Sequence, residues 1–370
     1  MMKKVAIYLA GIGTGGIESC TISQFEFIDK KRVEVDFLVD SSPVANFNVN
    51  KIHELNGKIV TCFHKVKSPF FKKILRPFAF VRAINKEQYD VVHLHISTPT
   101  ALVYALLCKC LTKCRVIATS HAQGVSNRSK TFIKLCEFSA QHLAKYCDKC
   151  YADSHLAGIW MYGKADFEVM VNGIDTDCLK FNYAERLRIR KELNIDDNTI
   201  LIGHVGRLST DKNHFFIIKV FDFYTKLHPS SELVLIGKGE LKNEIVERCQ
   251  QRGILNKVHF VESVSSLAPY YSAMDIFIFP SLREGFGLVA IEAQSSSLPV
   301  LASDTVPKET EQTNIIQYLS LNESEKKWSE KIQQMLLTTE EREKVDIAQL
   351  KKNCNIRILS EQLVQLYNSI

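Results

Sequence analysis

Residues 200–213 read ILIGHVGRLSTDKN, and this stretch shows how the chain is organised. It opens with a short apolar run, which is typical of a buried strand. It continues into GRLSTDKN, whose glycine, serine and asparagine indicate a turn. A helical pattern then follows over 213–226. The order strand, turn and helix predicts one unit of a parallel α/β sheet.

The same order recurs on both sides of this stretch. Further buried strands are expected in the second half over 232–237, 257–261, 275–279 and 299–303, with helices over 240–252 and 288–296. In the first half, strands are expected over 5–9, 35–39, 58–61, 91–95, 115–119, 149–152 and 168–171. The pattern therefore predicts an α/β protein with two parallel-sheet domains, followed by a helical tail after about residue 322.

The length supports this division, because 370 residues suit two domains of about 100–200 residues each. The turn-forming NGIDTD, residues 172–177, marks the expected boundary. We assign 1–180 to the first domain and 181–354 to the second.

Composition narrows the class of protein. With 46% hydrophobic and 24% charged residues, the chain is neither a disordered tail nor a fibrous repeat. No apolar run reaches the ~18–20 residues that cross a bilayer, so a soluble or surface-bound protein is expected.

The eleven cysteines accompany no secretion signal, which indicates reduced thiols in the cytosol rather than a disulfide framework or a metal site. The net charge of +6 arises in residues 1–185, which hold 24 Lys and Arg against 17 Asp and Glu.

The first candidate motif is GIGTGG, Gly11 to Gly16, directly after the first expected strand. Glycines at such a turn let the backbone approach a phosphate at the N-terminus of the next helix. The motif also fits an NAD(P) fingerprint, which requires an acidic residue further on, and Asp40 is the candidate. A tight turn without a ligand is the third interpretation, and the motif alone does not separate the three.

The second candidate lies in GRLSTDKN, where Arg207 and Lys212 follow the first strand of the second domain. Ligands of open α/β sheets bind at the carboxyl ends of the strands. A guanidinium and an ammonium group there suit a diphosphate. Taken alone, the two residues are equally consistent with solvated charges on a loop.

The third candidate is PSLREGFGLVAIEAQ, residues 280–294. Glu284 falls in the loop before an expected helix, and Glu292 falls inside that helix. Carboxylates accept hydrogen bonds only, so the pair suits the vicinal hydroxyls of a ribose or a hexose. The backbone N–H groups of 285–287 can bind a phosphate. The alternative is one glutamate at the helix N-terminus and one on the surface.

Together these motifs resemble the family-4 retaining glycosyltransferases of the GT-B fold. The resemblance rests on the E-x7-E pair, on GR…K upstream, on VNGID at 171–175 and on GGIE at 15–18, and it covers nearly the whole chain. The stretches IGHVGRLSTDKNH, LVLIGKGELK and LASDTVPKE look most like bacterial exopolysaccharide and capsular polysaccharide enzymes. The resemblance implies two Rossmann-like domains that face a central cleft, with a final helix near 355–370 that packs back on the first domain.

The resemblance also implies roles for individual residues. Glu284 contacts the transferred sugar, and His121, in TSHAQG, lies beside that sugar; both are the expected catalytic residues. A satisfied loop histidine is the alternative for His121. The expected donor-binding residues are Gly15, Gly16, Arg207, Lys212, Ser263, Val264, Gly285, Phe286, Gly287, Leu288 and Glu292. The sequence departs from the family at Ser297, where relatives usually carry glycine.

The implied reaction moves a hexose or an N-acetylhexosamine from a nucleotide-sugar, expected to be UDP-linked, to a lipid-linked saccharide. The family retains stereochemistry, and neither a divalent metal nor a separate cofactor is expected. Two alternatives stay open. An NAD-dependent oxidoreductase would use GIGTGG and Asp40, and a non-catalytic protein would bind the nucleotide-sugar without turnover.

Residues 64–86, HKVKSPFFKKILRPFAFVRAINK, contain seven Lys and Arg, no acidic residue and four phenylalanines. Basic and aromatic residues together suit an anionic membrane surface. A helix with aromatics in the core and charges in water is an equal alternative. The membrane interpretation gives a cytoplasmic protein on the inner face of the plasma membrane. A nucleic-acid partner is not expected, because no binding motif accompanies the charge.

Overall fold

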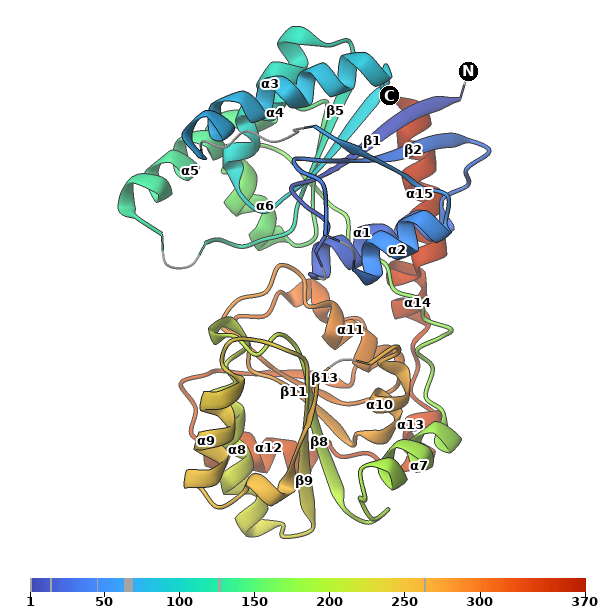
Figure 1. The fold of residues 1–370 in the computed structure, drawn as a ribbon. Helices are drawn as coiled ribbons and strands as arrows, with labels where there is room; N and C mark the ends of the chain where they lie inside the picture. Colours follow the sequence, from blue (N-terminus) through green and yellow to red (C-terminus); the bar gives the residue numbers. More distant parts are fainter. Residues whose placement is uncertain (1, 14, 45, 63–68, 126–127, 263) are drawn as a thin grey trace. The chain divides into compact units, whose positions relative to one another are not determined.

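The computed structural model describes residues 2–13, 15–44, 46–62, 69–125, 128–262 and 264–370 (Figure 1). The side chains of 69–74 lie outside this description. The chain forms two compact units. The first contains 1–174 and 354–370, and the second contains 175–353, so the division falls a few residues before the expected boundary.

The first unit is built on a parallel sheet of seven strands in the order β3-β2-β1-β4-β5-β6-β7. The register of β1 on β2 runs from Lys3 opposite Val33 to Leu9 opposite Val39. Apolar residues from Val5 to Leu9 fill both faces of β1, as expected for a strand covered by helices on each side, whereas one face of β4 carries His93 and His95. The strands are β1 Lys3–Leu9, β2 Val33–Val39, β3 Lys58–Thr61, β4 Val91–Ile96, β5 Arg115–Ser120, β6 Lys149–Ala152 and β7 Glu168–Val169.

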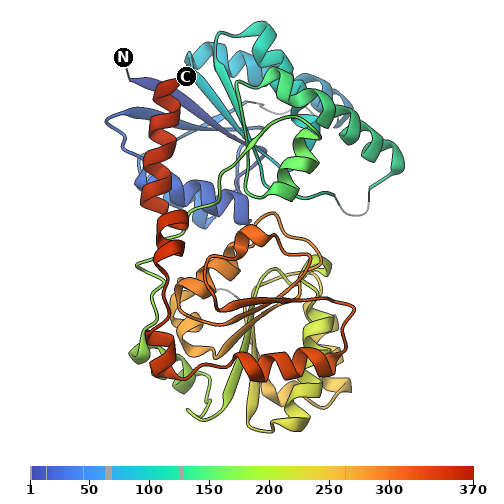
Figure 2. The ribbon, with the colours of Figure 1, turned by 180° about the vertical axis from the view of Figure 1, so that it is seen from behind.

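Helices cover the two faces of this sheet. Three of them, α1 Gly16–Phe27, α2 Phe47–Glu54 and α15 Ile356–Ser369, share one apolar core. The other core is shared by α3 Pro69–Glu87, α4 Leu102–Leu111, α5 Lys130–Leu143 and α6 His155–Tyr162. The last helix of the chain, α15, therefore belongs to the first unit, where it packs against α1, β1 and β2 (Figure 2).

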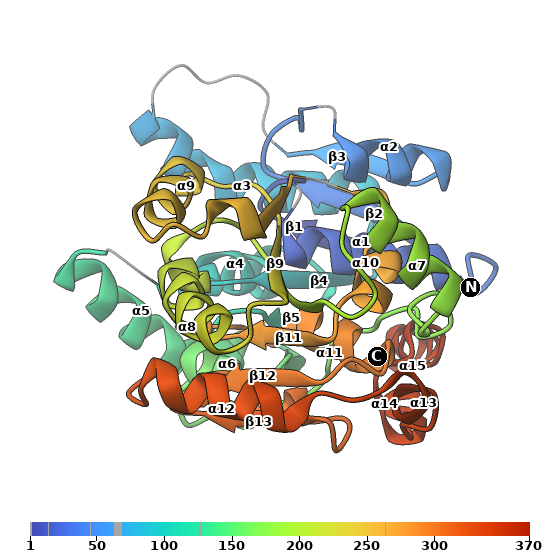
Figure 3. The ribbon, with the colours of Figure 1, turned by 90° about the horizontal axis from the view of Figure 1, so that it is seen from below.

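The second unit repeats the plan with six parallel strands in the order β10-β9-β8-β11-β12-β13. They are β8 Ile200–Val205, β9 Ser231–Ile236, β10 Val258–Val261, β11 Ile276–Phe279, β12 Val300–Ser303 and β13 Ile316–Leu319. On one face, α8 His214–Leu227 contacts both α9 Lys242–Gln251 and α12 Glu325–Met335 (Figure 3). The other face carries α7 Tyr183–Glu192, α10 Ala268–Ala273 and α11 Leu288–Ser295, and α13 Thr339–Glu343 and α14 Ala348–Cys354 follow α12.

The expected strands are all present, and each lies within two residues of its expected ends. One strand was missed: β13 lies at the edge of the second sheet, and its Gln317 and Tyr318 interrupt the apolar pattern. Ser297, where relatives usually carry glycine, has a φ of 52°. The backbone thus keeps the left-handed conformation that favours glycine.

Candidate active site

The loop after β8 positions Arg207 and Lys212 at the carboxyl end of the second sheet, as the sequence predicted. Arg207 is exposed, and the amide of Leu208 donates to the Lys238 carbonyl at 3.0 Å, which ties this loop to the one after β9. Lys212 ends a short 3₁₀ turn. The side-chain amide of Asn213 donates to the Pro280 carbonyl at 3.1 Å and so fixes the turn against the loop after β11.

The loop after β11 brings Glu284 to Lys212. Nζ of Lys212 lies 2.5 Å from Oε1 of Glu284, and the Glu284 side chain is only 9% exposed. The amide of Leu282 donates to the Asp211 carbonyl at 2.8 Å, so backbone contacts hold the two loops together. Lys212 also lies over the ring of Phe279, 5.5 Å from its centre. Its ammonium group is therefore held between a carboxylate and an aromatic face.

The segment from Gly285 to Leu288 leads into α11. Gly287 precedes the first helical residue with a φ of 93°, a conformation that a side chain would strain. Phe286 is buried, and the Thr310 hydroxyl donates to its carbonyl at 3.0 Å. Lys212 thus follows the carboxyl end of β8, whereas Glu284 and the N-terminus of α11 follow the carboxyl end of β11. The two strands are neighbours in the sheet.

Glu292 lies in the second turn of α11 and accepts a hydrogen bond of 2.7 Å from the Tyr271 hydroxyl through Oε2. Burial raises the pKa of Glu292 to about 7, against the opposing effect of the Tyr271 hydroxyl. A carboxyl with this pKa changes its charge near neutral pH. Tyr271 was not predicted from the sequence, because nothing in PYYSAM distinguishes it from a core tyrosine.

Two of the expected donor-binding residues, Ser263 and Val264, belong to the loop after β10. Val264 is partly buried against the apolar core of the second unit. Ser263 lies outside the described residues. Val261 ends β10, so this loop also leaves the carboxyl edge of the sheet.

In the first unit, the GIGTGG loop joins β1 to α1. Gly15 is the N-cap residue of α1, and a Cβ there would lie 2.5 Å from the Glu18 carboxylate, the flexible end of a side chain that can move aside. A Cβ at Gly16 would meet nothing within 4 Å. Asp40, the acidic residue of the NAD alternative, is buried; it accepts from the Tyr8 hydroxyl at 3.0 Å and lies 3.4 Å from Arg76. Its carboxylate is thus engaged inside the unit.

His121 follows β5, and its side chain is 2% exposed. Nε2 lies 2.9 Å from Nδ1 of His95. Nδ1 lies 3.4 Å from Oδ2 of Asp153, at ion-pair distance, although the geometry of a hydrogen bond is not reached. His95 and Asp153 were missed by the sequence analysis. The signal available was VVHLH, in which two histidines two residues apart share one face of a strand.

The basic stretch at 64–86 divides between core and surface. Phe80 is fully buried, so the core interpretation holds for this residue. Phe78 and Leu75 are 54% and 42% exposed, beside the exposed Arg82. The side chains of Phe70 and Phe71, and all of residues 63–68, lie outside what the structure describes.

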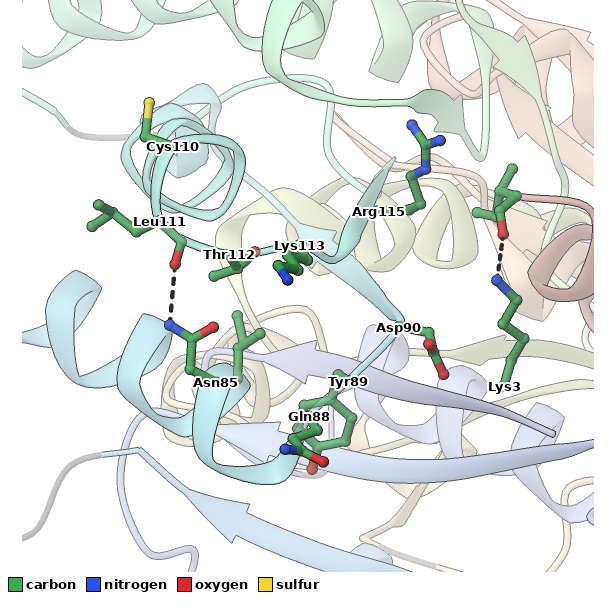
Figure 4. A pocket seen from close by; sticks show the side chains of 12 residues that line it. Lys3, Asn85, Gln88, Tyr89, Asp90, Cys110, Leu111, Thr112, Lys113 and Arg115 are labelled. Carbon is green, nitrogen blue, oxygen red and sulfur yellow. Dashed lines mark hydrogen bonds between the residues drawn. The ribbon is translucent and has the colours of Figure 1, made fainter. Parts of the chain in front are cut away.

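A cavity of ≈ 880 Å³ lies at the opposite edge of the first sheet, where β1, β4 and β5 begin (Figure 4). Lys3, Asp90 and Arg115 are among its lining residues. The Asp90 carboxylate accepts from the Lys4 amide at 2.8 Å, and Lys3 donates to the Ile370 carbonyl at 2.9 Å. Ligands of open α/β sheets bind at the carboxyl edge, so this cavity is not the candidate site despite its size.

All eleven cysteines are free thiols. Among the described residues, no group of three or more His, Cys, Asp or Glu side chains is placed to hold a metal ion. In the same part of the chain, no helix is both long and apolar enough to cross a membrane.

Comparisons with known proteins agree with the two-domain fold. The family description "Glycosyltransferase Family 4" matches residues 14–177, and "Glycosyl transferases group 1" matches residues 185–352. The two matches take up most of each unit, which is the domain pair of a glycosyltransferase with the GT-B fold. Both matches are to glycosyltransferases, so they favour this class of enzyme over the oxidoreductase suggested by GIGTGG and Asp40.

Individual proteins give the same result. The putative glycosyltransferase EpsF of Bacillus subtilis (strain 168) is 28% identical over 344 residues, or 89% of this chain and 87% of that protein. An Escherichia coli UDP-Gal:alpha-D-GlcNAc-diphosphoundecaprenol alpha-1,3-galactosyltransferase is 23% identical over 78% of this chain and 76% of its own. The crystal structure of Anabaena HepE with UDP and glucose superposes with a TM-score of 0.80, at 17% identity over 100% of both chains. The chain belongs to the family-4 glycosyltransferases.

Proposed function

We propose that this enzyme transfers a hexose or an N-acetylhexosamine from a UDP-sugar to a lipid-linked saccharide, in the synthesis of a cell-surface polysaccharide. The names of similar proteins support the donor and the acceptor. The E. coli relative is named for UDP-Gal and a diphosphoundecaprenol-linked acceptor, and the HepE structure contains UDP and glucose.

One observation carries the proposal. Loops at one edge of the second sheet carry Arg207, Lys212 and Glu284. The same edge holds the start of α11, and Glu292 lies one turn further along this helix. Two cations and a helix N-terminus suit a diphosphate. A carboxylate with one oxygen engaged by Tyr271 keeps the other for ribose hydroxyls.

The proposed chemistry follows from where charge develops. As the bond from the anomeric carbon to the diphosphate oxygen breaks, negative charge grows on the leaving phosphate. Lys212, Arg207 and the N–H groups at the start of α11 stabilise this charge. Glu284 lies beside Lys212 and stabilises the oxocarbenium-like sugar through its negative charge.

The new bond forms between the acceptor oxygen and the anomeric carbon, on the face that the diphosphate leaves. The proton of the acceptor hydroxyl passes to the leaving phosphate oxygen, so stereochemistry is retained without a covalent enzyme intermediate. Because protein cations and a helix terminus meet the diphosphate, the proposal includes no metal ion. Activity in excess EDTA is the expected result, and its loss would contradict this part.

We propose that the enzyme binds the cytoplasmic face of an anionic membrane, and that the exposed face of α3 makes this contact. Phe78 and Leu75 are exposed there, and Arg82 and Lys86 lie one and two turns further on the same face. Apolar and basic side chains on one helical face suit an anionic lipid surface. The double variant Arg82→Glu, Lys86→Glu should release the protein from phosphatidylserine vesicles, while Lys326→Glu on α12 serves as the control. Equal sedimentation of both would overturn the placement.

The test of the enzymatic proposal is direct. The protein is incubated with UDP-glucose, UDP-galactose, UDP-GlcNAc or UDP-GalNAc and with undecaprenyl-diphosphate-linked GlcNAc. Mass spectrometry of the lipid product and the release of UDP report transfer, with Glu284→Gln as the matched inactive control. Transfer from at least one donor is expected; transfer by Glu284→Gln at the wild-type rate would contradict the role of Glu284.

A further inference from the structure

Four of the eleven cysteines lie together at the amino edge of the first sheet. Cys147 is the C-cap residue of the 3₁₀ turn Ala144–Tyr146, and Cys150 is the second residue of β6. Cys108 lies in the last turn of α4, and Cys114 immediately precedes β5. All four side chains pack in the apolar core that α3, α4, α5 and α6 share. The fold therefore gathers two cysteine motifs, CKCLTKC and CDKC, on one face of the sheet.

Within each motif, two thiols interact with each other. The Cys147 thiol stabilises the Cys150 thiolate as a hydrogen-bond donor, and the Cys108 thiol does the same for Cys114. We call Cys147 and Cys150 the outer pair, and Cys108 and Cys114 the inner pair. All of these cysteines are free thiols. Each pair thus consists of two reduced sulfur atoms that the fold holds side by side.

Asp148, between the two outer cysteines, fixes the turn that carries them. Its amide donates to the Val116 carbonyl at 2.7 Å, and its carboxylate accepts from the Val116 amide at 2.8 Å. Arg115 and Lys109 lie 2.9 Å and 3.2 Å from the same carboxylate. The amide of Cys147 donates to the carbonyl at the start of the 3₁₀ turn at 3.2 Å. The outer pair is therefore presented by an anchored turn and not by a free loop.

The two pairs differ in their access to solvent. Cys108 and Cys114 are 0% and 6% exposed, so the inner pair lies inside the core. Cys147 and Cys150 are only partly buried. A small solute in water therefore reaches the outer pair first.

The contact gives the two outer thiols different reactivity. The interaction with Cys147 lowers the pKa of Cys150, against the opposing effect of burial. The same interaction, together with burial and the nearby Asp148 charge, raises the pKa of Cys147. The thiolate is the nucleophile in thiol oxidation. Cys150 is thus the thiol that reacts first, and Cys147 is the neighbouring thiol that completes a disulfide.

We infer that Cys147 and Cys150 form a redox-modification site, which hydrogen peroxide converts to an intramolecular disulfide. The Cys150 thiolate attacks one peroxide oxygen, and the O–O bond breaks. The departing hydroxide takes up the proton that Cys150 has lost, which leaves a sulfenic acid and one water. The Cys147 sulfur then attacks the Cys150 sulfur and forms the S–S bond. The hydroxyl leaves with the Cys147 proton as a second water.

Two thiols are oxidised in this sequence, and one peroxide is reduced to two waters. A dithiol reductant reverses the modification by thiol–disulfide exchange. Accessible cysteines of lowered pKa beside a second thiol are typical of reversible redox sensors. The inference goes beyond the proposed transfer reaction and does not rest on it.

Tryptic mapping of the wild-type protein tests the disulfide, because cleavage after Lys145 and Lys149 places the outer cysteines in peptides 146–149 and 150–164. The protein is treated with a small excess of hydrogen peroxide, and free thiols are then blocked with iodoacetamide in denaturant. We expect the two peptides as one species, two hydrogens lighter than their sum, which dithiothreitol separates. Recovery of both peptides in alkylated form, under conditions that oxidise the exposed Cys110, would overturn the inference.

The inner pair is the matched control, because it has the same contact without the access. Cys108, in tryptic peptide 87–109, should be recovered alkylated while the outer disulfide forms. Oxidation of Cys108 at the same rate would mean that access does not select the site, and would overturn the assignment to the outer pair.

Two variants test the order of the steps with dimedone, which reacts with sulfenic acids. Cys147→Ser removes the second thiol, so the intermediate should persist and Cys150 should be labelled. Cys150→Ser removes the attacking thiolate, so Cys147 should remain unlabelled. Equal labelling of Cys147 and Cys150 in the two variants would contradict the assigned roles. The mapping of the wild-type protein stands whether or not the variants fold.

Discussion

Lys212 and Glu284 are 72 residues apart in the chain, and Nζ of the first lies 2.5 Å from Oε1 of the second. The family resemblance gives these residues different partners, the diphosphate for Lys212 and the transferred sugar for Glu284. The structure shows that each orients the other. Because Glu284 holds the ammonium group, Lys212 loses less side-chain freedom when it meets a phosphate.

Replacing Glu284 with glutamine should separate binding from catalysis. The amide retains the size of the side chain but removes the charge, so Lys212 keeps its full charge for the diphosphate. We expect UDP affinity to stay equal or to rise, while the rate of transfer falls by about 10²–10³-fold. Calorimetry with UDP and turnover with the active donor measure the two effects.

The control is Lys212→Ala, which removes a charged contact worth about 1.5–3 kcal/mol and should weaken UDP binding by about 10–100-fold. Equal losses of UDP affinity in Glu284→Gln and Lys212→Ala would mean that the pair acts only as a structural unit.

Glu292 should make UDP binding depend on pH. Its pKa of about 7 means that the carboxylate required by ribose hydroxyls is the minor form at pH 6 and the major form at pH 8. Binding to the ionised form alone should therefore weaken about tenfold from pH 8 to pH 6. Affinity rises with pH because the raised pKa is that of the ligand-free carboxyl, which must lose its proton.

Titration of UDP itself also contributes to this slope, so Glu292→Gln is measured over the same pH range. The variant should retain only the part that belongs to UDP. If wild type and variant show the same slope, Glu292 does not bind in its ionised form.

Ser297 adopts a φ of 52°, and glycine should relieve the strain. The left-handed conformation costs a non-glycine residue about 1–2 kcal/mol, and the greater freedom of glycine in the unfolded chain offsets about 0.5–1 kcal/mol of that gain. We expect Ser297→Gly to stabilise the second unit by up to about 1 kcal/mol, or roughly 2–4 °C in Tm. The neighbouring Ser296 has a φ of −86°, so Ser296→Gly should destabilise instead. A lower calorimetric Tm for Ser297→Gly than for Ser296→Gly would show that the backbone of Ser297 is not strained.

Arg342 should be essential for the stability of the second unit. Its buried guanidinium donates to five backbone carbonyls, those of Tyr271, Ser272, Met274, Ser296 and Ser297. Leucine would leave these acceptors without their donor, at about 1–3 kcal/mol for each buried group. We expect Arg342→Leu to lower the free energy of unfolding by at least about 3 kcal/mol in urea titrations.

The exposed Arg188, which pairs with Glu185 and Glu192 on one helix, provides the control. Arg188→Leu should leave the free energy of unfolding nearly unchanged, because an ion pair in water contributes little to stability. If the Arg342 substitution is equally mild, its hydrogen bonds contribute little to stability.

The sequence predicts the strands well because buried parallel strands are continuous apolar runs. It misses β13 because Gln317 and Tyr318 are tolerated at a sheet edge. Phe78 is exposed and Phe80 is buried. Composition cannot distinguish them, because they are the same residue type and differ only in the side of the helix on which they lie.

The site follows the same logic. Arg207, Lys212, Glu284 and Glu292 stand in local motifs that the sequence displays. His95 and Asp153 become visible only when neighbouring strand ends meet, because each is an ordinary residue in its own segment. The effect of Tyr271 on Glu292 likewise depends on packing between α10 and α11.

The most direct test of the account is a thermal-shift panel with UDP, GDP, UDP-sugars and NAD, run on wild type and on Lys212→Ala. A ligand at about 100 times its dissociation constant adds about 2.7 kcal/mol of stability, which is several degrees in Tm. The account predicts a shift with UDP and at least one UDP-sugar, reduced in Lys212→Ala, and none with NAD. A shift with NAD alone, or a UDP shift unchanged by Lys212→Ala, would contradict it.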